Sequence, residues 1–325
     1  MPTYAVPRSV PLLLMLTALQ VVSSQARSGP PPIIDMHMHA LGASDQGPPP
    51  VFVCPVSAEL MPPQHQDKVE LGELMSCAHP LGSTMTDDAI RTKTLAIMEK
   101  YNVTGVTSGS MARVRQWKAA APRRIVPAVT GGSIDSIRAW GKSHQIEVIG
   151  ELGLQYAGIA PNSPIVAQYL ALGEELDLPV ALHVGPGPPG AVYVAAPKYR
   201  MAASDPLLLE EALIAHPRAR VDVMHAGWPM IDNMIALMWA HPQVYVDVGV
   251  LSWAVPRAEY YSYLKRLIDA GFGKRVMFGS DQMVWPEALE IAIQGIQQAP
   301  FLTAQQKRDI LYNNAARFLR LKAVP

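Results

Sequence analysis

The chain alternates between short apolar runs and longer amphipathic stretches. The apolar runs are rich in β-branched residues, which is typical of parallel strands that are buried on both faces. Eight such runs predict strands, at residues 32–40, 103–107, 125–130, 148–152, 180–184, 221–225, 244–248 and 276–279. The stretches between them predict helices, at residues 86–101, 111–121, 133–143, 164–176, 205–215, 230–240, 258–270 and 286–298, and a further helix is expected at 303–319.

Eight successive strand–helix units predict an α/β fold, a (β/α)8 or TIM barrel with a C-terminal helix. An open doubly wound sheet is not favoured, because no Gly-x-Gly-x-x-Gly motif follows any predicted strand. Residues 41–85 interrupt the alternation after the first strand and are rich in proline and glycine. Because loops of this length are usually functional, we expect this insertion to form a lid on a single barrel domain at residues 27–325.

The N-terminal residues predict export. Arg8 precedes an apolar run at residues 10–22, and Ser24-Gln25-Ala26 follows as a small-x-small cleavage site. The run is shorter than the roughly 20 residues that span a bilayer. We therefore expect residues 1–26 to be a signal peptide and the mature chain to be periplasmic or secreted, without a stable membrane anchor.

The charge and the cysteines of the chain bear on its expected binding partners and on its cellular compartment. The chain has 27 Lys and Arg and 27 Asp and Glu, so its formal net charge is zero and nucleic acid is not an expected partner. A small-molecule substrate is expected, and it is left open whether the chain forms a homo-oligomer.

Cys54 and Cys77 both lie in the insertion. In an oxidising compartment they could pair, and the alternative is two free buried thiols.

The first predicted strand carries polar side chains on one face. Successive side chains of a strand point to opposite faces, so Asp35, His37 and His39 share a face. Two imidazoles at this spacing can bind one cation from the same side, because neutral imidazole is a common metal ligand. The alternative is a pair of buried histidines that hydrogen bond within the core.

Other residues of the same chemical types stand at the ends of further predicted strands. These are Glu151, His183, His225 and Asp281. Barrel enzymes place their chemistry at the C-terminal ends of the strands. A buried imidazole or carboxylate without a partner costs on the order of a few kcal/mol, so convergence on a cation is the more economical explanation. The remaining histidines are expected to be structural or ordinary loop residues, namely His65, His79, His144, His216 and His241.

This constellation resembles the amidohydrolase superfamily over residues 33–320. The resemblance rests on Asp35-x-His37-x-His39, the two later strand-end histidines, Gly279-Ser-Asp281 and the closing Tyr312-Asn-Asn-Ala-Ala-Arg-Phe-Leu319. The most similar branch is the amidohydrolase-related (amidohydrolase 2) group, which includes aminocarboxymuconate semialdehyde decarboxylase-like enzymes. The resemblance implies a divalent metal, most often zinc, that is held by His37, His39, His183 and Asp281. It also implies that His225 orients the substrate or the metal-bound water.

The fourth strand departs from the pattern of the binuclear members of the superfamily. It offers Glu151 and no lysine, so a carbamylated lysine cannot bridge two metals. A glutamate in Gly150-Glu-Leu-Gly153 is similar to the TatD-type nucleases, which keeps a second metal bridged by Glu151 open. We favour one metal, because strands 3 and 4 offer no other obvious ligand.

The expected reaction is hydrolysis of a C–N or C–O bond in a small carbonyl compound by a metal-activated water. Asp281 would be both a metal ligand and the proton acceptor. A metal-dependent decarboxylase would use the same residues, and a barrel that binds a ligand without turnover is a third interpretation. The candidates for substrate contact are Trp228, Tyr156 and Trp253, which could stack on a flat ring, and Arg200, which could bind an anionic group.

Overall fold

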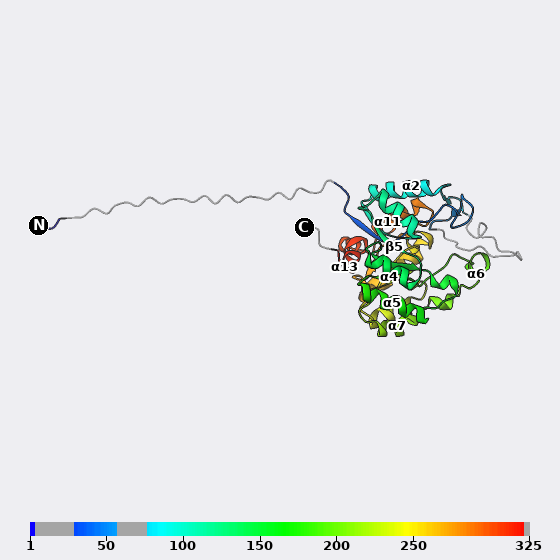
Figure 1. The fold of residues 1–325 in the computed structure, drawn as a ribbon. Coiled ribbons are helices and arrows are strands. Elements are labelled where there is room, and N and C mark those ends of the chain that lie inside the picture. The colour runs from blue at the N-terminus through cyan, green and yellow to red at the C-terminus, as the bar shows by residue number, and fades with distance from the viewer. Residues whose placement is uncertain (4–28, 57–76, 322–325) are drawn as a thin grey trace. The chain divides into compact units, whose positions relative to one another are not determined.

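The computed structural model describes residues 1–3, 29–56 and 77–321 (Figure 1). The predicted signal peptide, apart from its first three residues, lies outside this part of the chain, and so do His65 and the middle of the predicted lid. The chain divides into two units, Met1–Pro30 and Pro31–Pro325, and the elements below all belong to the second. Within the described ranges, no helix is long and apolar enough to cross a membrane.

Eight parallel strands form the predicted barrel, which confirms the fold class. They are β1 (Ile33–His39), β4 (Val103–Ser108), β5 (Ile125–Val129), β6 (Val148–Leu152), β7 (Val180–His183), β8 (Val221–Met224), β9 (Val244–Asp247) and β10 (Val276–Met277), and each pairs with the next. Two backbone hydrogen bonds bring the first and last strands together. The N–H of Met36 donates to the carbonyl of Phe278 at 2.8 Å, and the N–H of Asp281 donates to the carbonyl of His37 at 2.7 Å.

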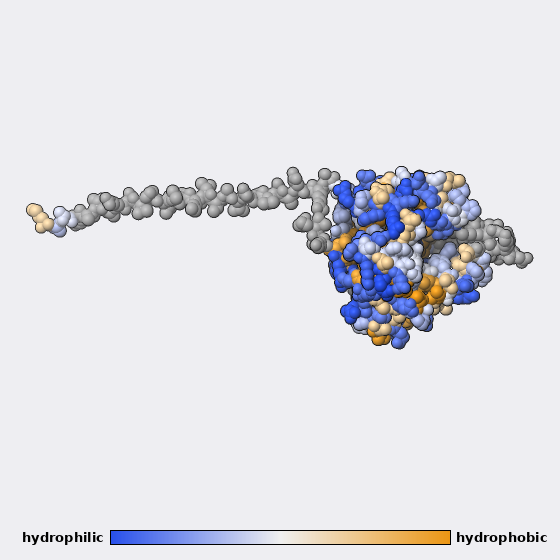
Figure 2. Space-filling view, in the orientation of Figure 1, coloured by the Kyte–Doolittle hydropathy of each residue, from blue (hydrophilic) through white to orange (hydrophobic). Residues whose placement is uncertain are grey.

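Helices lie around the barrel in Figure 1, and each follows one of the strands in the sequence. They are α2 (Asp87–Lys100), α3 (Met111–Ala120), α4 (Ile134–Lys142), α5 (Pro164–Leu176), α7 (Glu210–Ala215), α8 (Ile231–Ala240), α10 (Arg257–Leu267) and α11 (Pro286–Gln297). Thr86, Ser110 and Ser133 cap three of them, each accepting a hydrogen bond from a backbone N–H in the first turn. The face of the molecule in Figure 2 is mainly hydrophilic, as expected for the outer surfaces of such helices.

Three of the predicted helices are interrupted. The predicted helix at 205–215 begins as the 3-10 helix η3 (Pro206–Leu209), and the one at 258–270 continues past α10 as the π-helical turn η5 (Ile268–Phe272). The predicted C-terminal helix at 303–319 comprises α12 (Ala304–Arg308), the π-helical turn η6 (Asp309–Asn313) and α13 (Asn314–Phe318). At this last interruption the side-chain amide of Asn314 donates to the carbonyls of Gly273 and Val276, which ties the helix to the segment around β10.

Short elements that the periodicity did not predict lie in the loops between strands and helices. They are β2 (Phe52–Val53), β3 (Leu81–Gly82), η1 (Leu154–Ala157), α6 (Ala191–Val194), η2 (Met201–Ser204), η4 (His225–Gly227) and α9 (Leu251–Ala254). β2 and β3 form an antiparallel pair from the two ends of the insertion. Next to this pair, Cys54 and Cys77 form a disulfide, which confirms the pairing. The function of the insertion as a lid stays a prediction.

The barrel interior is apolar toward the beginnings of the strands. Ile34, Val148 and Met277 form one buried cluster that Ala315 and Phe318 of α13 join. α13, red in Figure 1, accordingly lies beside the beginning of β1. This end of the barrel is filled mainly with hydrophobic side chains, whereas the polar residues predicted from the sequence lie at the C-terminal ends of the strands.

Candidate metal centre

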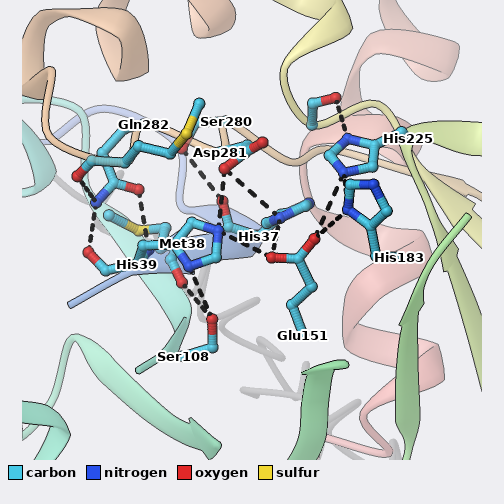
Figure 3. A network of polar contacts seen from close by, with 12 residues as sticks. His37, Met38, His39, Ser108, Glu151, His183, His225, Ser280, Asp281 and Gln282 are labelled. Atoms are coloured by element: carbon cyan, nitrogen blue, oxygen red, sulfur yellow. Dashed lines mark hydrogen bonds and ion pairs between the residues drawn. The ribbon is translucent and has the colours of Figure 1, made fainter. Parts of the chain in front are cut away.

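Six polar side chains meet at the C-terminal ends of the barrel strands (Figure 3). Two come from β1, one from β6, one from β7 and two from the residues after β8 and β10, namely His37, His39, Glu151, His183, His225 and Asp281. All six were predicted from their positions at strand ends, and the structure brings them together. The barrel therefore converts six distant positions in the sequence into one cluster.

The carboxylate of Glu151 lies between two pairs of imidazoles. Its Oε2 is 3.2 Å from Nε2 of His39 and 3.5 Å from Nε2 of His37. Its Oε1 is 2.6 Å from Nδ1 of His183 and 3.5 Å from Nε2 of His225. The two carboxylate oxygens thus face different histidine pairs, as Figure 3 shows.

Asp281 completes the β1 side of the cluster. Its Oδ1 is 3.0 Å from Nε2 of His39 and 3.7 Å from Nε2 of His37. The residue has a φ of 50°, a conformation that aspartate tolerates better than most residues. Because the backbone N–H of Asp281 donates to the carbonyl of His37, this turn directs the carboxylate toward β1.

The cluster contains three sets of donor atoms whose members lie within 4.8 Å of one another. They are His37, His39 and Glu151; Glu151, His183 and His225; and His37, His225 and Asp281. His225 was predicted to orient substrate or water, but its Nε2 lies 2.9 Å from Nδ1 of His183 and belongs to two of these sets. Its position makes it a candidate ligand as well.

The residues present fit a divalent cation. Nε2 of His37 and Nε2 of His183 are buried and lack a hydrogen-bond partner. An unsatisfied buried polar group costs about 1–3 kcal/mol, and a bound cation would remove that cost for both imidazoles. Imidazole nitrogen and carboxylate oxygen together suit zinc and the neighbouring transition metals.

The cluster holds its carboxylates ionised. Burial alone would raise the pKa of Glu151, but the surrounding imidazoles, His37 first, keep the pKa of this carboxyl well below its usual range. The pKa of Asp281 is lowered in the same way by His37 and His39. In return, burial would lower the pKa of His39, but its hydrogen bonds to Asp281 and Glu151 outweigh burial and raise that pKa to about 9. The charge of the carboxylates therefore favours a positively charged occupant.

Three supporting residues were not predicted. Oδ1 of Asp247 lies 3.2 Å from Nδ1 of His37, and Oγ of Ser108 lies 3.0 Å from Nδ1 of His39. Gln282 hydrogen bonds to the backbone of His39. Asp247 is the last residue of β9, so the strand-end rule that found the six donors would also have found it. Ser108 ends β4 in the same way, whereas Gln282 has no signal beyond its place next to Asp281.

The four predicted substrate contacts differ in their surroundings. Tyr156 is 38% exposed, and its ring centroid is 4.9 Å from that of His183, so it borders the cluster. Trp228 is partly buried and donates its indole N–H to Glu259, and the exposed Arg200 donates to the carbonyls of Pro197 and Tyr199. The prediction that Trp253 contacts the substrate was wrong. Trp253 is 1% exposed and donates its indole N–H to the carbonyl of Ser280, so it packs in the core behind Asp281 and does not face a substrate.

The histidines outside the cluster are ordinary, as expected, in the part of the chain that the structure describes. His216 lies 3.3 Å from Glu174, and His241 lies 3.4 Å from Glu210, in both cases at the end of a helix. His79 and His144 are exposed. None of these four joins a set of candidate metal ligands among the described residues.

A family model described as Amidohydrolase matches residues 34–321, and the chain therefore belongs to the amidohydrolase family. This confirms the resemblance drawn from the strand-end motifs. The chain is an enzyme of a metal-dependent family that acts on small molecules, and its His, Glu and Asp cluster is able to hold the metal. No curated protein sequence matches the chain.

Solved structures with the same fold include enzymes of several reaction types. 5-Carboxyvanillate decarboxylase from Sphingomonas paucimobilis is 14% identical, with a TM-score of 0.52 over 70% of this chain and 82% of that one. A probable 2-pyrone-4,6-dicarboxylic acid hydrolase from Acinetobacter baumannii is 14% identical, with a TM-score of 0.55 over 89% and 99%. 4-Oxalomesaconate hydratase from Rhodopseudomonas palustris is 15% identical, with a TM-score of 0.52 over 89% and 95%. At these identities the likeness shows the barrel fold alone.

Proposed function

We propose that the chain is a metal-dependent hydrolase that cleaves a C–N or C–O bond in a small carbonyl compound. The observation that carries the proposal is the ionised carboxylate of Asp281, which lies beside two imidazoles at the C-terminal ends of the barrel strands. Such a carboxylate can hold a metal and accept a proton in the same place.

The metal would be held by imidazoles of the cluster together with Glu151 and Asp281. When bound there, a divalent cation lowers the pKa of a water ligand toward about 7 and polarises a carbonyl group. Asp281 accepts the proton of the attacking water and returns it to the leaving group. Tyr156, whose ring borders His183, contacts the substrate at the rim of the site.

The placement of Glu151 bears on the number of metal ions. The sequence favoured one ion, but six donor residues exceed the four that a structural or catalytic zinc site usually takes. With Oε2 facing His37 and His39 and Oε1 facing His183 and His225, one ion on each side of Glu151 would use every donor. We therefore include two zinc ions in the proposal, which would be held by Glu151 together with the histidines on its two sides and Asp281.

Export is part of the same proposal. A disulfide between Cys54 and Cys77 is stable in an oxidising compartment and is rare in the cytosol. The pairing thus supports a periplasmic or secreted enzyme whose N-terminal residues are removed.

A substrate screen tests the reaction. The zinc-loaded protein is assayed with a panel of amides, esters and lactones and, separately, with unsaturated and aromatic carboxylic acids with trapping of carbon dioxide. We expect hydrolysis of members of the first set, lost in His37→Ala and kept in His216→Asn, a histidine that contacts Glu174 away from the cluster. Carbon dioxide release without hydrolysis would establish the decarboxylase alternative. Activity that survives a chelator and His37→Ala would contradict a metal-dependent reaction altogether.

A further inference from the structure

The short segment from Asp247 to Gly249, at the end of β9, contacts two imidazoles of the cluster from behind. Oδ1 of Asp247 lies 3.2 Å from Nδ1 of His37, and the carbonyl of Gly249 lies 3.0 Å from Nδ1 of His225. The backbone N–H of Gly249 also donates to Oδ1 of Asp247 at 2.6 Å. One segment therefore presents acceptors to imidazoles that come from two other strands.

We propose that Asp247 is a positioning residue of the metal site, and that it and Gly249 hold His37 and His225 with the proton on Nδ1. This inference rests on the proposed function, because it concerns how the imidazoles present themselves to the metal. A hydrogen bond at one ring nitrogen fixes which nitrogen is free to bind a cation. With Nδ1 bonded on this side, Nε2 of each ring faces Glu151, at 3.5 Å in both cases.

The backbone around the segment is built to let these groups approach. A Cβ atom on Gly249 would lie 2.4 Å from Nδ1 of His37 and 2.8 Å from Oδ1 of Asp247. A Cβ atom on Gly279, after β10, would lie 2.7 Å from the same carboxylate oxygen and 2.8 Å from Cβ of His37. Neither glycine has a positive φ, so the close approach itself explains why no side chain is present.

The chemistry of the acceptor distinguishes the two contacts. The side chains of His37 and Asp247 are both fully buried, so their contact is not screened by water. A buried carboxylate behind an imidazole makes Nε2 of that ring a stronger donor to a metal, whereas a neutral carbonyl mainly orients the ring. Asp247→Asn removes this charge and hardly changes the shape of the side chain. We therefore expect it to weaken metal binding through the loss of charge.

Asp247→Asn tests the charge, with Asp222→Asn as the matched control. Asp222 lies on the neighbouring strand β8, is equally buried, and forms no hydrogen bond or ion pair with the six donor residues. Burial and the nearby Asp247 raise the pKa of its carboxyl well above the usual range, so Asp222→Asn removes no charge. We expect Asp247→Asn to raise the dissociation constant for Zn²⁺, measured by competition with a chromophoric chelator, by about 10- to 100-fold. Asp222→Asn should leave it unchanged. Wild-type zinc affinity in folded Asp247→Asn would overturn the inference.

A spectroscopic measurement on the unmutated chain keeps the inference testable if Asp247→Asn does not fold. With ¹⁵N-labelled histidine and zinc bound, the ring nitrogens of His37 and His225 should both show the proton on Nδ1, after assignment by His37→Gln and His225→Gln. A proton on Nε2 of His37 would overturn the inference while leaving the hydrolase proposal intact. A wild-type chain that binds no zinc would instead contradict the proposed function itself.

Discussion

The side-chain amide of Gln282 makes two hydrogen bonds to the backbone of His39. Its Oε1 accepts from the N–H of His39 at 3.1 Å, and its Nε2 donates to the carbonyl of the same residue at 2.7 Å. Gln282 thus replaces a neighbouring strand at the point where β1 ends, and it holds the backbone of one metal-facing imidazole next to Asp281.

Gln282→Ala should destabilise the protein through this contact. It leaves a buried N–H and a buried carbonyl without partners, and each such group costs about 1–3 kcal/mol. We expect the free energy of unfolding in urea to fall by about 2 kcal/mol or more. Gln297→Ala, at an exposed position of α11, is the control and should change it little. Equal unfolding midpoints for both variants would show that Gln282 does not support β1.

The metal content should depend on Glu151. If this carboxylate bridges two ions, elemental analysis of the wild-type chain should give close to two equivalents of zinc. Glu151→Gln should then reduce the content to near one and cost as much activity as Asp281→Asn. A single equivalent in the wild-type chain, with a milder effect of Glu151→Gln, would restore the one-metal site that the sequence favoured.

Asp281→Asn should separate turnover from metal binding. The substitution removes the proton acceptor but leaves the imidazoles in place, so zinc should be largely retained. We expect the rate constant kcat to fall on the order of 10²-fold or more, the usual size of a general-base effect. Metal content and kcat are measured on the same preparation. Full activity in zinc-loaded Asp281→Asn would exclude Asp281 as the base.

The stability of the metal-free protein should depend on pH through His39. Its pKa is raised from 6.5 to about 9 in the folded state. A raised pKa means that the folded state binds the proton more tightly, so this contribution is fully present below pH 6.5 and is lost as the pH rises through about 9. The free energy of unfolding in urea, determined between pH 6 and pH 10, measures this contribution. The loss at high pH should be smaller in His39→Gln, and an identical pH profile in both proteins would refute this contribution.

The disulfide should contribute to stability by closing the insertion. Cys54 and Cys77 are 23 residues apart, and a loop of that length corresponds to about 3 to 4 kcal/mol in the chain-entropy model. Mass spectrometry of exported protein under non-reducing conditions should find no alkylatable thiol. Cys54→Ser should lower the free energy of unfolding by about the same amount. Two free thiols in exported protein would contradict the pairing.

The sequence predicted the barrel because eight short apolar runs alternate with amphipathic stretches. Polar residues at or just after the ends of several of these runs located His183 and Asp281, which lie far apart along the chain and meet at one end of the barrel. Asp247 also ends a strand, β9, but it faces an imidazole of the cluster. Asp247 acts through His37, and only the packing of the strands shows that contact.

Two other features depend on packing that periodicity does not encode. Trp253 follows a strand end and could have faced a substrate, but its indole N–H finds a partner in the carbonyl of Ser280 and the ring is enclosed. The C-terminal helix was expected to be continuous over residues 303–319, yet a π-helical turn interrupts it just before Asn314, whose side chain bonds to the backbone around β10. In both cases a tertiary hydrogen bond decides the local structure.

The hydrogen bonds that join β1 to the segment after β10 also set the order in which the site can assemble. His39 and Gln282 are 243 residues apart, and the N–H of Met36 donates to the carbonyl of Phe278, which is nearly as distant in the sequence. During synthesis, the two histidines of β1 leave the ribosome long before their partners exist. Because contacts this distant in sequence form late in folding, the metal site is completed only when the barrel closes. Zinc binding by nascent chains of increasing length should therefore report the closure of the barrel.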